Sequence, residues 1–434
     1  MKFLFKIVIL FLIIFNWRIP VLYNTVFLAI LITTVYYIFN NKTIPFTYFF
    51  QRYIAVILIG SVFLAFIIFA YTLFHHTNVT AGVQKRVWVM LQMICAVIYA
   101  LPLFVEDKKS TAFDEICVIV CYVFAVQGLI HLTAYLYEPL GDFLFEMKPE
   151  GIKEKVLNPS FNVDRFRLYC LSGIVFVELV AAYGVAFILF FRLQLQGGHP
   201  YFNGWKQYVV LFFLIMGTSL AGRTGFVGFG LGILLWLLFS YNRIFTFINN
   251  NIISIIVISL LLLFSFNVLL SSQQRAMFNS ELFPYSFEWF YNYRDYGTFS
   301  VVSLEATEQQ HYFYLRDETL LRGHGEAFEW VSNSIYPPTD AGYMNILIFG
   351  GIPFLICLII YQSLYFSRPI SIARRTNTYF NRIDAACFII LFIYVFILNY
   401  KTSALGTLHT VETLFIAAGS TYIIQYNSRD KLNE

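Results

Sequence analysis

The sequence predicts an all-α protein: a polytopic helical membrane protein with about 12 transmembrane helices and one large loop outside the membrane. Hydrophobic residues make up 59% of the 434-residue chain, and charged residues only 12%. A soluble domain averages roughly 45–50% apolar and about 25% charged residues. A chain so poor in charge would not cover itself with a soluble surface, so we expect much of its surface to face lipid.

A membrane-spanning helix needs about 20 mostly apolar residues. The chain contains twelve such segments, which we place at residues 3–18, 20–39, 52–74, 87–105, 113–137, 169–191, 208–222, 224–241, 252–270, 341–362, 384–400 and 404–425. Lys2 and Lys6 lead the first one, as in a signal peptide, but no small-residue cleavage site follows, so we expect it to be retained. No internal repeat is evident, which predicts a single transmembrane domain over residues 1–434.

Lysines and arginines in the short connecting segments predict the orientation. Cytoplasmic N- and C-termini leave most of these cations inside, including the four arginines of the segment 367–383. The cations that remain on the outer side exceed what orientation would favour. This excess indicates that some of them bind an anion there.

Residues 271–340 are expected to form the large periplasmic loop, inserted between spans 9 and 10. The loop contains ten acidic residues, four arginines and no lysine, and sixteen of its residues are aromatic. Its densest aromatic run, 283–293, is either an amphipathic helix on the lipid headgroups or a platform on which aromatic rings stack against sugars. Both interpretations hold together if the helix borders a cleft.

Arg223 lies between the seventh and eighth spans, which are joined almost without a loop. A guanidinium at a membrane boundary is costly unless it snorkels to lipid phosphate or binds another anion. Arg223 is therefore either a snorkelling residue or a bidentate grip on a substrate diphosphate. The glycines that follow it are expected to permit close helix packing, and they lack the Gly-Lys-Ser/Thr ending of a nucleotide loop. They are Gly225, Gly228, Gly230 and Gly232.

Two residues at the end of the large loop are candidate acid–base groups. His324 lies between two glycines in a turn, where either ring nitrogen can face a ligand. Asp340 directly precedes the tenth span, where a carboxylate also caps helices. Helix capping by Asp340 and simple solvation of His324 are the alternative interpretations.

Other ionisable residues fall inside the predicted spans, where bare charge is expensive and functional roles are common. Lys401, near the outer end of the eleventh span, matches the depth of Arg223, so both can serve one anionic site. The others are His131, Glu178, His409 and Glu412. The six cysteines lie inside apolar runs, and no His-x-x-x-His or Cys-x-x-Cys spacing occurs. We therefore expect no disulfide, metal or cofactor, and the scattered basic residues argue against nucleic acid as a partner.

Four short motifs accompany these spans: Thr218-Ser-Leu-Ala-Gly-Arg-Thr-Gly225, Arg322-Gly-His-Gly325, Asp340-Ala-Gly-Tyr343 and Arg165-Phe-Arg-Leu168. In these motifs, and in its layout over the whole chain, the sequence resembles the O-antigen polymerase family, in the superfamily that includes O-antigen ligases. Ligases commonly carry a His-Asn or His-Ser pair at the end of the loop. Here Ser332-Asn-Ser334 occupies that neighbourhood without a histidine, which favours the polymerase.

The resemblance implies a metal-independent glycosyltransferase of the bacterial inner membrane. It would move a growing glycan from undecaprenyl diphosphate to the terminal sugar of the next lipid-linked repeat. The expected base is His324 or Asp340. The residues expected to hold the diphosphate are Arg223, Arg322, Arg165, Arg167 and Lys401. The implied partners are the undecaprenyl-diphosphate-linked oligosaccharide, membrane lipid and a chain-length regulator protein.

Two alternatives stay open. One is an O-antigen ligase, which transfers the finished glycan to lipid A-core. The other, from a different class, is a secondary transporter or lipid-linked sugar flippase. A transporter should line its midplane with discontinuous helices and charges, whereas the charges singled out here gather at the outer face.

Overall fold

The computed structural model describes residues 2–17, 24–40, 48, 51–74, 80–105, 111–148, 153–154, 165–172, 177–197, 199–240, 272–286, 288–297, 311–325, 336, 339, 341–375, 378–402, 404–405 and 408–433. Within these ranges the regular elements are helices, apart from one β-bridge between His199 and Phe202. The predicted span at 252–270 lies outside the described residues.

The long apolar helices follow the predicted spans closely. They are α1 (Lys2–Phe15), α2 (Thr25–Phe39), α4 (Arg52–Phe74), α5 (Thr80–Val105), α6 (Ala112–Leu136), α9 (Val177–Leu195), α10 (Trp205–Ala221), α11 (Gly225–Ser240), α18 (Gly342–Arg375), α19 (Tyr379–Lys401) and α20 (His409–Asn433). Among the described residues, six helices are long and apolar enough to cross a membrane, and α2, α10 and α11 are shorter apolar helices. The all-α, membrane-embedded fold class is thus confirmed, while the number of twelve spans stays a prediction.

Shorter helices connect the long ones. They are α7 (Glu138–Glu146), η3 (Arg165–Leu168), α13 (Ser272–Met277), η5 (Phe278–Leu282), α14 (Phe283–Ser286), α15 (Glu288–Tyr296) and α17 (Asp317–Arg322). The described residues of the aromatic run 283–293 are helical and belong to α14 and α15.

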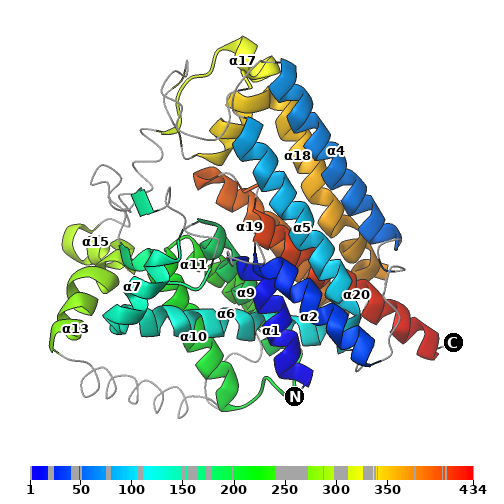
Figure 1. Cartoon of the computed structure of the whole chain (residues 1–434), viewed down its shortest axis with the longest axis horizontal. Helices are drawn as coiled ribbons and strands as arrows, with labels where there is room; N and C mark the ends of the chain where they lie inside the picture. Colours follow the sequence, from blue (N-terminus) through cyan, green and yellow to red (C-terminus); the bar gives the residue numbers. More distant parts are fainter. Residues whose placement is uncertain are drawn as a thin grey trace.

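Contacts between helix ends show that the chain runs back and forth between two ends of a helical bundle. At one end, the starts of α1 and α6 meet in a buried ion pair between Lys6 and Glu115 (2.6 Å). There the backbone N–H of Phe113 donates to Gln425, late in α20 (2.8 Å). We call this the N/C end. Figure 1 shows α7 and α15 at the left of the view and α17 at its top, away from both termini, and we call this part of the molecule the loop end.

The arginine-rich segment between α18 and α19 belongs to the N/C end. Arg192, late in α9, is fully buried and donates from Nε to Asp384 at the start of α19 (2.9 Å). Its Nη1 lies 2.5 Å from Asp114 at the start of α6, and its guanidinium lies over the ring of Phe113. These contacts bring the starts of α6 and α19 together, opposite the large loop.

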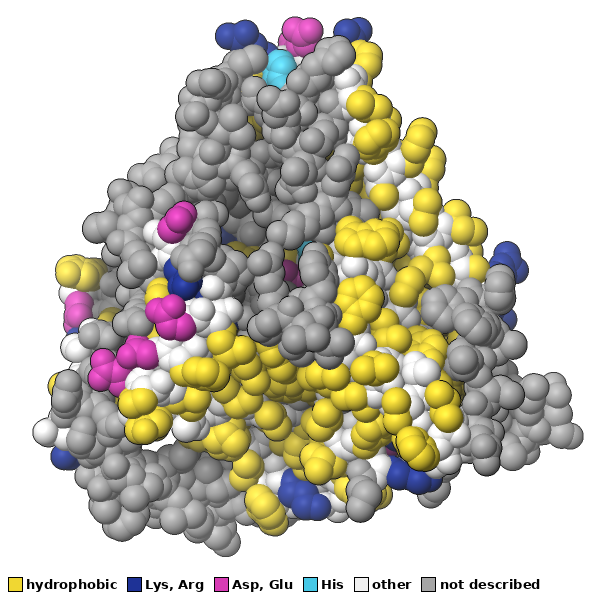
Figure 2. All heavy atoms as spheres, in the orientation of Figure 1, with side chains coloured by type: hydrophobic (Ala, Val, Ile, Leu, Met, Phe, Trp, Pro, Cys, Tyr) yellow, Lys and Arg dark blue, Asp and Glu magenta, His cyan; other side chains and the backbone are white. Residues whose placement is uncertain are grey.

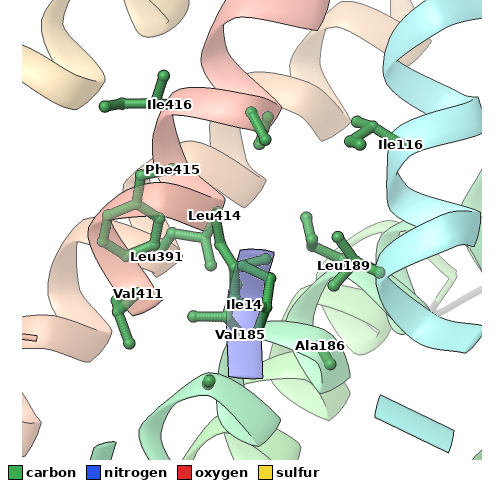
Figure 3. Packing of buried hydrophobic residues seen from close by; sticks show 14 of the residues in the cluster. Ile14, Ile116, Val185, Ala186, Leu189, Leu391, Val411, Leu414, Phe415 and Ile416 are labelled. Carbon is green, nitrogen blue, oxygen red and sulfur yellow. The ribbon is translucent and has the colours of Figure 1, made fainter. Parts of the chain in front are cut away.

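Apolar side chains both fill the bundle and cover its outside. Figure 3 shows the interior, where residues of α6, α9, α19 and α20 interlock around Ile14 of α1. Hydrophobic side chains also cover broad areas of the surface in Figure 2. Large ones with half or more of their area exposed include Leu31, Ile38, Ile59, Phe63, Phe66, Ile356, Ile360 and Leu238. In water such a surface would cause association, so it is the surface expected to face lipid.

Two of the helices that differ in length from their predicted spans are α9 and α18. The helix α9 begins at Val177, eight residues after the start of the predicted span 169–191. The ammonium of Lys148 binds the backbone oxygens of Cys170 (2.7 Å) and Ser172 (2.5 Å), which holds these residues in a turn. The other difference is in α18, which continues to Arg375 and is interrupted at Gly351, where the backbone leaves the helical conformation (φ 66°).

Candidate functional site

The junction between α10 and α11 presents Arg223 to the large loop. The two helices end and begin at Ala221 and Gly225, so the predicted boundary between these spans is confirmed. Arg223 is largely buried, with 22% of its side chain exposed, and forms an ion pair with Glu288 at the start of α15. Its anionic partner in the described structure is thus a carboxylate of the protein.

Arg167 lies at the same junction. It is part of η3, and its Nε donates to the backbone oxygen of Ala221, the last residue of α10 (3.1 Å). The structure therefore brings together two of the predicted diphosphate-binding residues, Arg167 and Arg223. Arg165 also lies in η3, but its side chain is outside the described part of the chain.

An aromatic cluster fixes the large loop against this junction. Phe166 of η3 packs edge-on against Tyr135 of α6, with ring centroids 5.6 Å apart. Phe278 of η5 contacts Tyr135 (5.3 Å) and is itself covered by Phe283 of α14 (5.7 Å). These contacts hold the start of α15 close to the α10–α11 junction, because α15 begins at Glu288, five residues after Phe283.

The helix α15 exposes aromatic rings beside the paired Glu288. About half of the side-chain area of Phe290 and Tyr293 is exposed, and more of Tyr296. Exposed aromatic faces next to hydrogen-bonding groups suit the stacking of sugar rings. The geometry thus places an aromatic surface and two arginines in one neighbourhood, although they are far apart in the sequence.

The turn 322–325 closes the break in α18. The backbone N–H groups of His324 and Gly325 donate to the oxygens of Ile348 (2.7 Å) and Phe349 (2.8 Å), which the interrupted helix leaves without intrahelical donors. The turn needs glycine, because Gly323 and Gly325 have positive φ angles (69° and 67°). The Gly-His-Gly motif therefore has an architectural role.

His324 is held by its side chain as well. Its Nε2 is hydrogen-bonded to the hydroxyl of Thr319 (2.7 Å), which in turn contacts the hydroxyl of Tyr336 (2.7 Å). The ring is only partly buried. Arg322, the other predicted residue of this turn, is exposed at the end of α17.

Lys401 lies at the end of α19, against the start of α18. The backbone of Gly342 packs so closely on Thr402 that a side chain there would overlap it. The neighbouring Tyr312 donates its hydroxyl to the backbone oxygen of Tyr400 (2.7 Å). Burial, followed by the nearby tyrosines, raises the pKa of Tyr312 to about 12, so this donor keeps its proton at neutral pH. Asp340, predicted at this position, lies outside the described residues.

The predicted residues thus occupy two places on the loop end. The first is the α10–α11 junction with Arg167 and Arg223, and the second is the turn 322–325 with the ends of α18 and α19. Figure 1 separates the two places, since α15 lies at the left of the view and α17 at its top. Arg223 is paired with Glu288, whereas the end of α19 that carries Lys401 packs against Gly342. That both cations serve one site therefore stays a prediction.

Sequence reasoning missed two residues at the junction. Glu288 was counted only as one acid among many in the loop. Arg275 of α13 lies one turn before Phe278, and its buried Nε has no hydrogen-bond partner in the described structure. Arg275 was counted only among the four arginines of the loop, and it lies three residues before Phe278, which packs on Tyr135.

Other ionisable residues within the spans have structural contacts. His131 Nε2 is hydrogen-bonded to the backbone oxygen of Phe166 (2.8 Å), which helps to fix η3. Glu178 accepts the backbone N–H of Thr410 at the start of α20 (2.9 Å). In the described ranges no group of three or more histidine, cysteine or acidic side chains could hold a metal ion. No protein-family model matches the chain, and neither a characterised protein nor a solved structure matches it significantly.

Proposed function

We propose that this chain is a glycan polymerase, a glycosyltransferase that joins lipid-diphosphate-linked oligosaccharide repeats. It works at the outer face of a bacterial inner membrane, with both termini in the cytoplasm and the loop end in the periplasm. One observation carries the proposal: the α10–α11 junction unites Arg223 and Arg167 with the exposed aromatic helix α15. A lipid-linked glycan has the matching parts, a diphosphate at the membrane boundary and sugars beyond it.

The reaction asks two things of the protein. The bond between the anomeric carbon and the diphosphate oxygen breaks, and the electron pair leaves with the lipid diphosphate. Arginines aimed at that oxygen stabilise its growing charge, and their fork geometry suits a phosphate. Arg223 takes this role and Arg167 assists it from the same junction.

The second requirement is a base for the attacking hydroxyl of the next repeat. Its oxygen forms the new bond to the anomeric carbon, and its proton goes to a nearby group. The candidate bases are those predicted from the sequence, Asp340 and His324, of which His324 lies in the turn that closes the break in α18. A positioned base contributes roughly 10²–10⁴ in rate.

The break in α18 supports an enzyme over a transporter. Transporters place broken helices near the membrane midplane, where the open helix ends bind the cargo. In α18 the backbone of the turn 322–325 occupies the carbonyls that the break at Gly351 opens. These carbonyls are thus not available to coordinate an ion.

The test is the glycan that a deletion strain makes, because three candidate functions act on one precursor. Without a polymerase, single repeats are still exported and ligated, which gives lipopolysaccharide capped by one unit. Without a ligase, long chains accumulate on the lipid carrier and the core stays bare. Without a flippase, neither outer-face product forms. We expect the single-unit product, and a bare core with long carrier-linked chains would overturn the proposal in favour of the ligase.

A further inference from the structure

The described anionic partner of Arg223 belongs to the protein itself. Glu288 comes from α15, 65 residues further along the chain, and both side chains are about four-fifths buried in the pair. A carboxylate and a phosphate present the same pair of oxygens to a guanidinium. Glu288 therefore occupies the place that the proposed function gives to the substrate diphosphate.

A membrane makes such a partner necessary. An arginine at the bilayer boundary lies beside phospholipid headgroups, whose singly charged phosphodiesters attract it. An open arginine site would be filled by these abundant lipids, and a scarce lipid-linked substrate would compete with all of them. The ion pair between Arg223 and Glu288 prevents phospholipid phosphates from binding to Arg223.

We infer that Glu288 is a specificity-determining residue. Its carboxylate keeps singly charged lipid phosphates from binding to Arg223, whereas a diphosphate displaces it. The inference rests on the proposed function of this site and names how the site selects its ligand. The carboxylate is tethered, because Phe278 and Phe283 hold the loop on the cluster of Tyr135 and Phe166. A tethered group competes at an effective concentration in roughly the millimolar range.

Charge decides which ligands displace it. A phosphodiester carries one negative charge, like the carboxylate, so it gains nothing by replacing a tethered competitor. A lipid diphosphate carries more charge and a second phosphate, and Arg167 lies at the same junction to receive it. Only the diphosphate therefore offers a second cation–anion contact that offsets the loss of the Glu288 pair.

The test is the ligand selectivity of the purified full-length protein. Binding of farnesyl diphosphate and of methyl farnesyl phosphate, a singly charged phosphodiester, is measured in nanodiscs, with phosphatidylglycerol at several fractions as the competitor. In Glu288→Gln the amide keeps the size of the side chain but loses its charge. We expect phosphodiester affinity to rise by about tenfold and diphosphate affinity by less, because the lost pair is a partly buried charged contact. We expect phosphatidylglycerol to compete with the diphosphate in this variant and not in the wild type.

Asp295→Asn is the matched control, because Asp295 lies on the same helix but pairs with Arg294 at the exposed surface. It should leave the selectivity ratio unchanged. A Glu288→Gln variant that keeps the wild-type ratio would overturn the inference. If this variant does not accumulate, Glu288→Asp replaces it and should lower the ratio by a smaller factor; an unchanged ratio there would also refute the inference. An Arg223→Lys variant with wild-type diphosphate binding would instead refute the proposed diphosphate site itself.

Discussion

Arg223 and Arg192 are two arginines of one bundle with opposite surroundings. Arg223 lies at the loop end, partly exposed, and faces one carboxylate from a loop. Arg192 lies at the N/C end, fully buried between Asp114 and Asp384. The first can exchange its partner for a ligand, whereas the second is enclosed by the core. We therefore expect changes at Arg223 to alter activity and changes at Arg192 to alter stability.

For Arg223→Lys we expect polymer formation to fall by roughly ten- to a hundredfold while the amount of protein in the membrane stays normal. Lysine keeps the charge but loses the fork that binds a phosphate through two parallel hydrogen bonds. Elongation of lipid-linked repeats by purified protein measures this loss. Arg294→Lys, in the exposed pair on α15, is the control and should elongate normally. Near-normal elongation by Arg223→Lys would indicate that Arg223 only snorkels to lipid.

Arg192→Met should lower the free energy of unfolding by about 3–5 kcal/mol, because it leaves Asp114 and Asp384 buried without their shared cation. Thermal unfolding in detergent, monitored by tryptophan fluorescence, measures this loss of stability. Arg294→Met removes an arginine from a solvent-exposed pair and should leave the unfolding temperature unchanged. Equal shifts in the two variants would contradict the assignment.

The sequence predicted the cations of the site better than their partners. Arg223 could be found because a guanidinium between two apolar runs has a known cost and few remedies. Glu288 could not be found, because it is one acid in an acid-rich loop and its contact spans 65 residues. A pairing so distant in the chain depends on how Phe278 and Phe283 dock, and no local pattern encodes that docking.

At the scale of helices, glycine sets how closely α9 and α11 approach. A methyl group on Gly228 of α11 would overlap the backbone of Gly184 in α9, whereas one on Gly230 would meet no atom within 4 Å among the described residues. The predicted role of these glycines in packing is thus confirmed for Gly228 and does not apply to Gly230.

These two glycines give a matched pair of variants. Gly228→Ala should destabilise the protein by about 1–3 kcal/mol, because the helices must separate to admit the methyl group. Gly230→Ala fills open space and should leave stability unchanged or raise it by up to about 1 kcal/mol. Unfolding temperatures of the two variants in the same detergent decide this. Similar losses at both positions would show that the α9–α11 contact is not the cause.

Apolar runs predicted most helices to within a few residues, because helix length and lipid-compatible composition are local properties. The break in α18 was missed although a local signal is present. Pro353 follows Gly350 and Gly351 and has no N–H to donate to the backbone oxygen of Phe349. Gly350 and Gly351 lie within an apolar run that is long enough to continue as a helix. The interrupted helix is stable in an apolar environment because the backbone N–H groups of His324 and Gly325 donate to the carbonyl oxygens that the break leaves open.

At the scale of the whole molecule, the two ends of the bundle should face opposite sides of the membrane. Single cysteines are introduced at Tyr314, which is 80% exposed at the loop end, and at Tyr379, which is exposed at the N/C end. The six native cysteines are first replaced by alanine or serine. In intact spheroplasts an impermeant thiol reagent should label position 314 and not position 379. Position 379 should become labelled only after the membrane is opened, and equal labelling in intact cells would refute this topology.

The seal between the turn 322–325 and α18 also imposes an order on biosynthesis. The donors at residues 324 and 325 leave the ribosome before the acceptors at residues 348 and 349. When α18 reaches the lipid, its open carbonyls need donors at once, because an unsatisfied carbonyl costs several kcal/mol in hydrocarbon. The large loop must therefore have crossed the membrane and be waiting at its surface when α18 is inserted. A segment translocated earlier thus serves as the template on which a later membrane helix is completed.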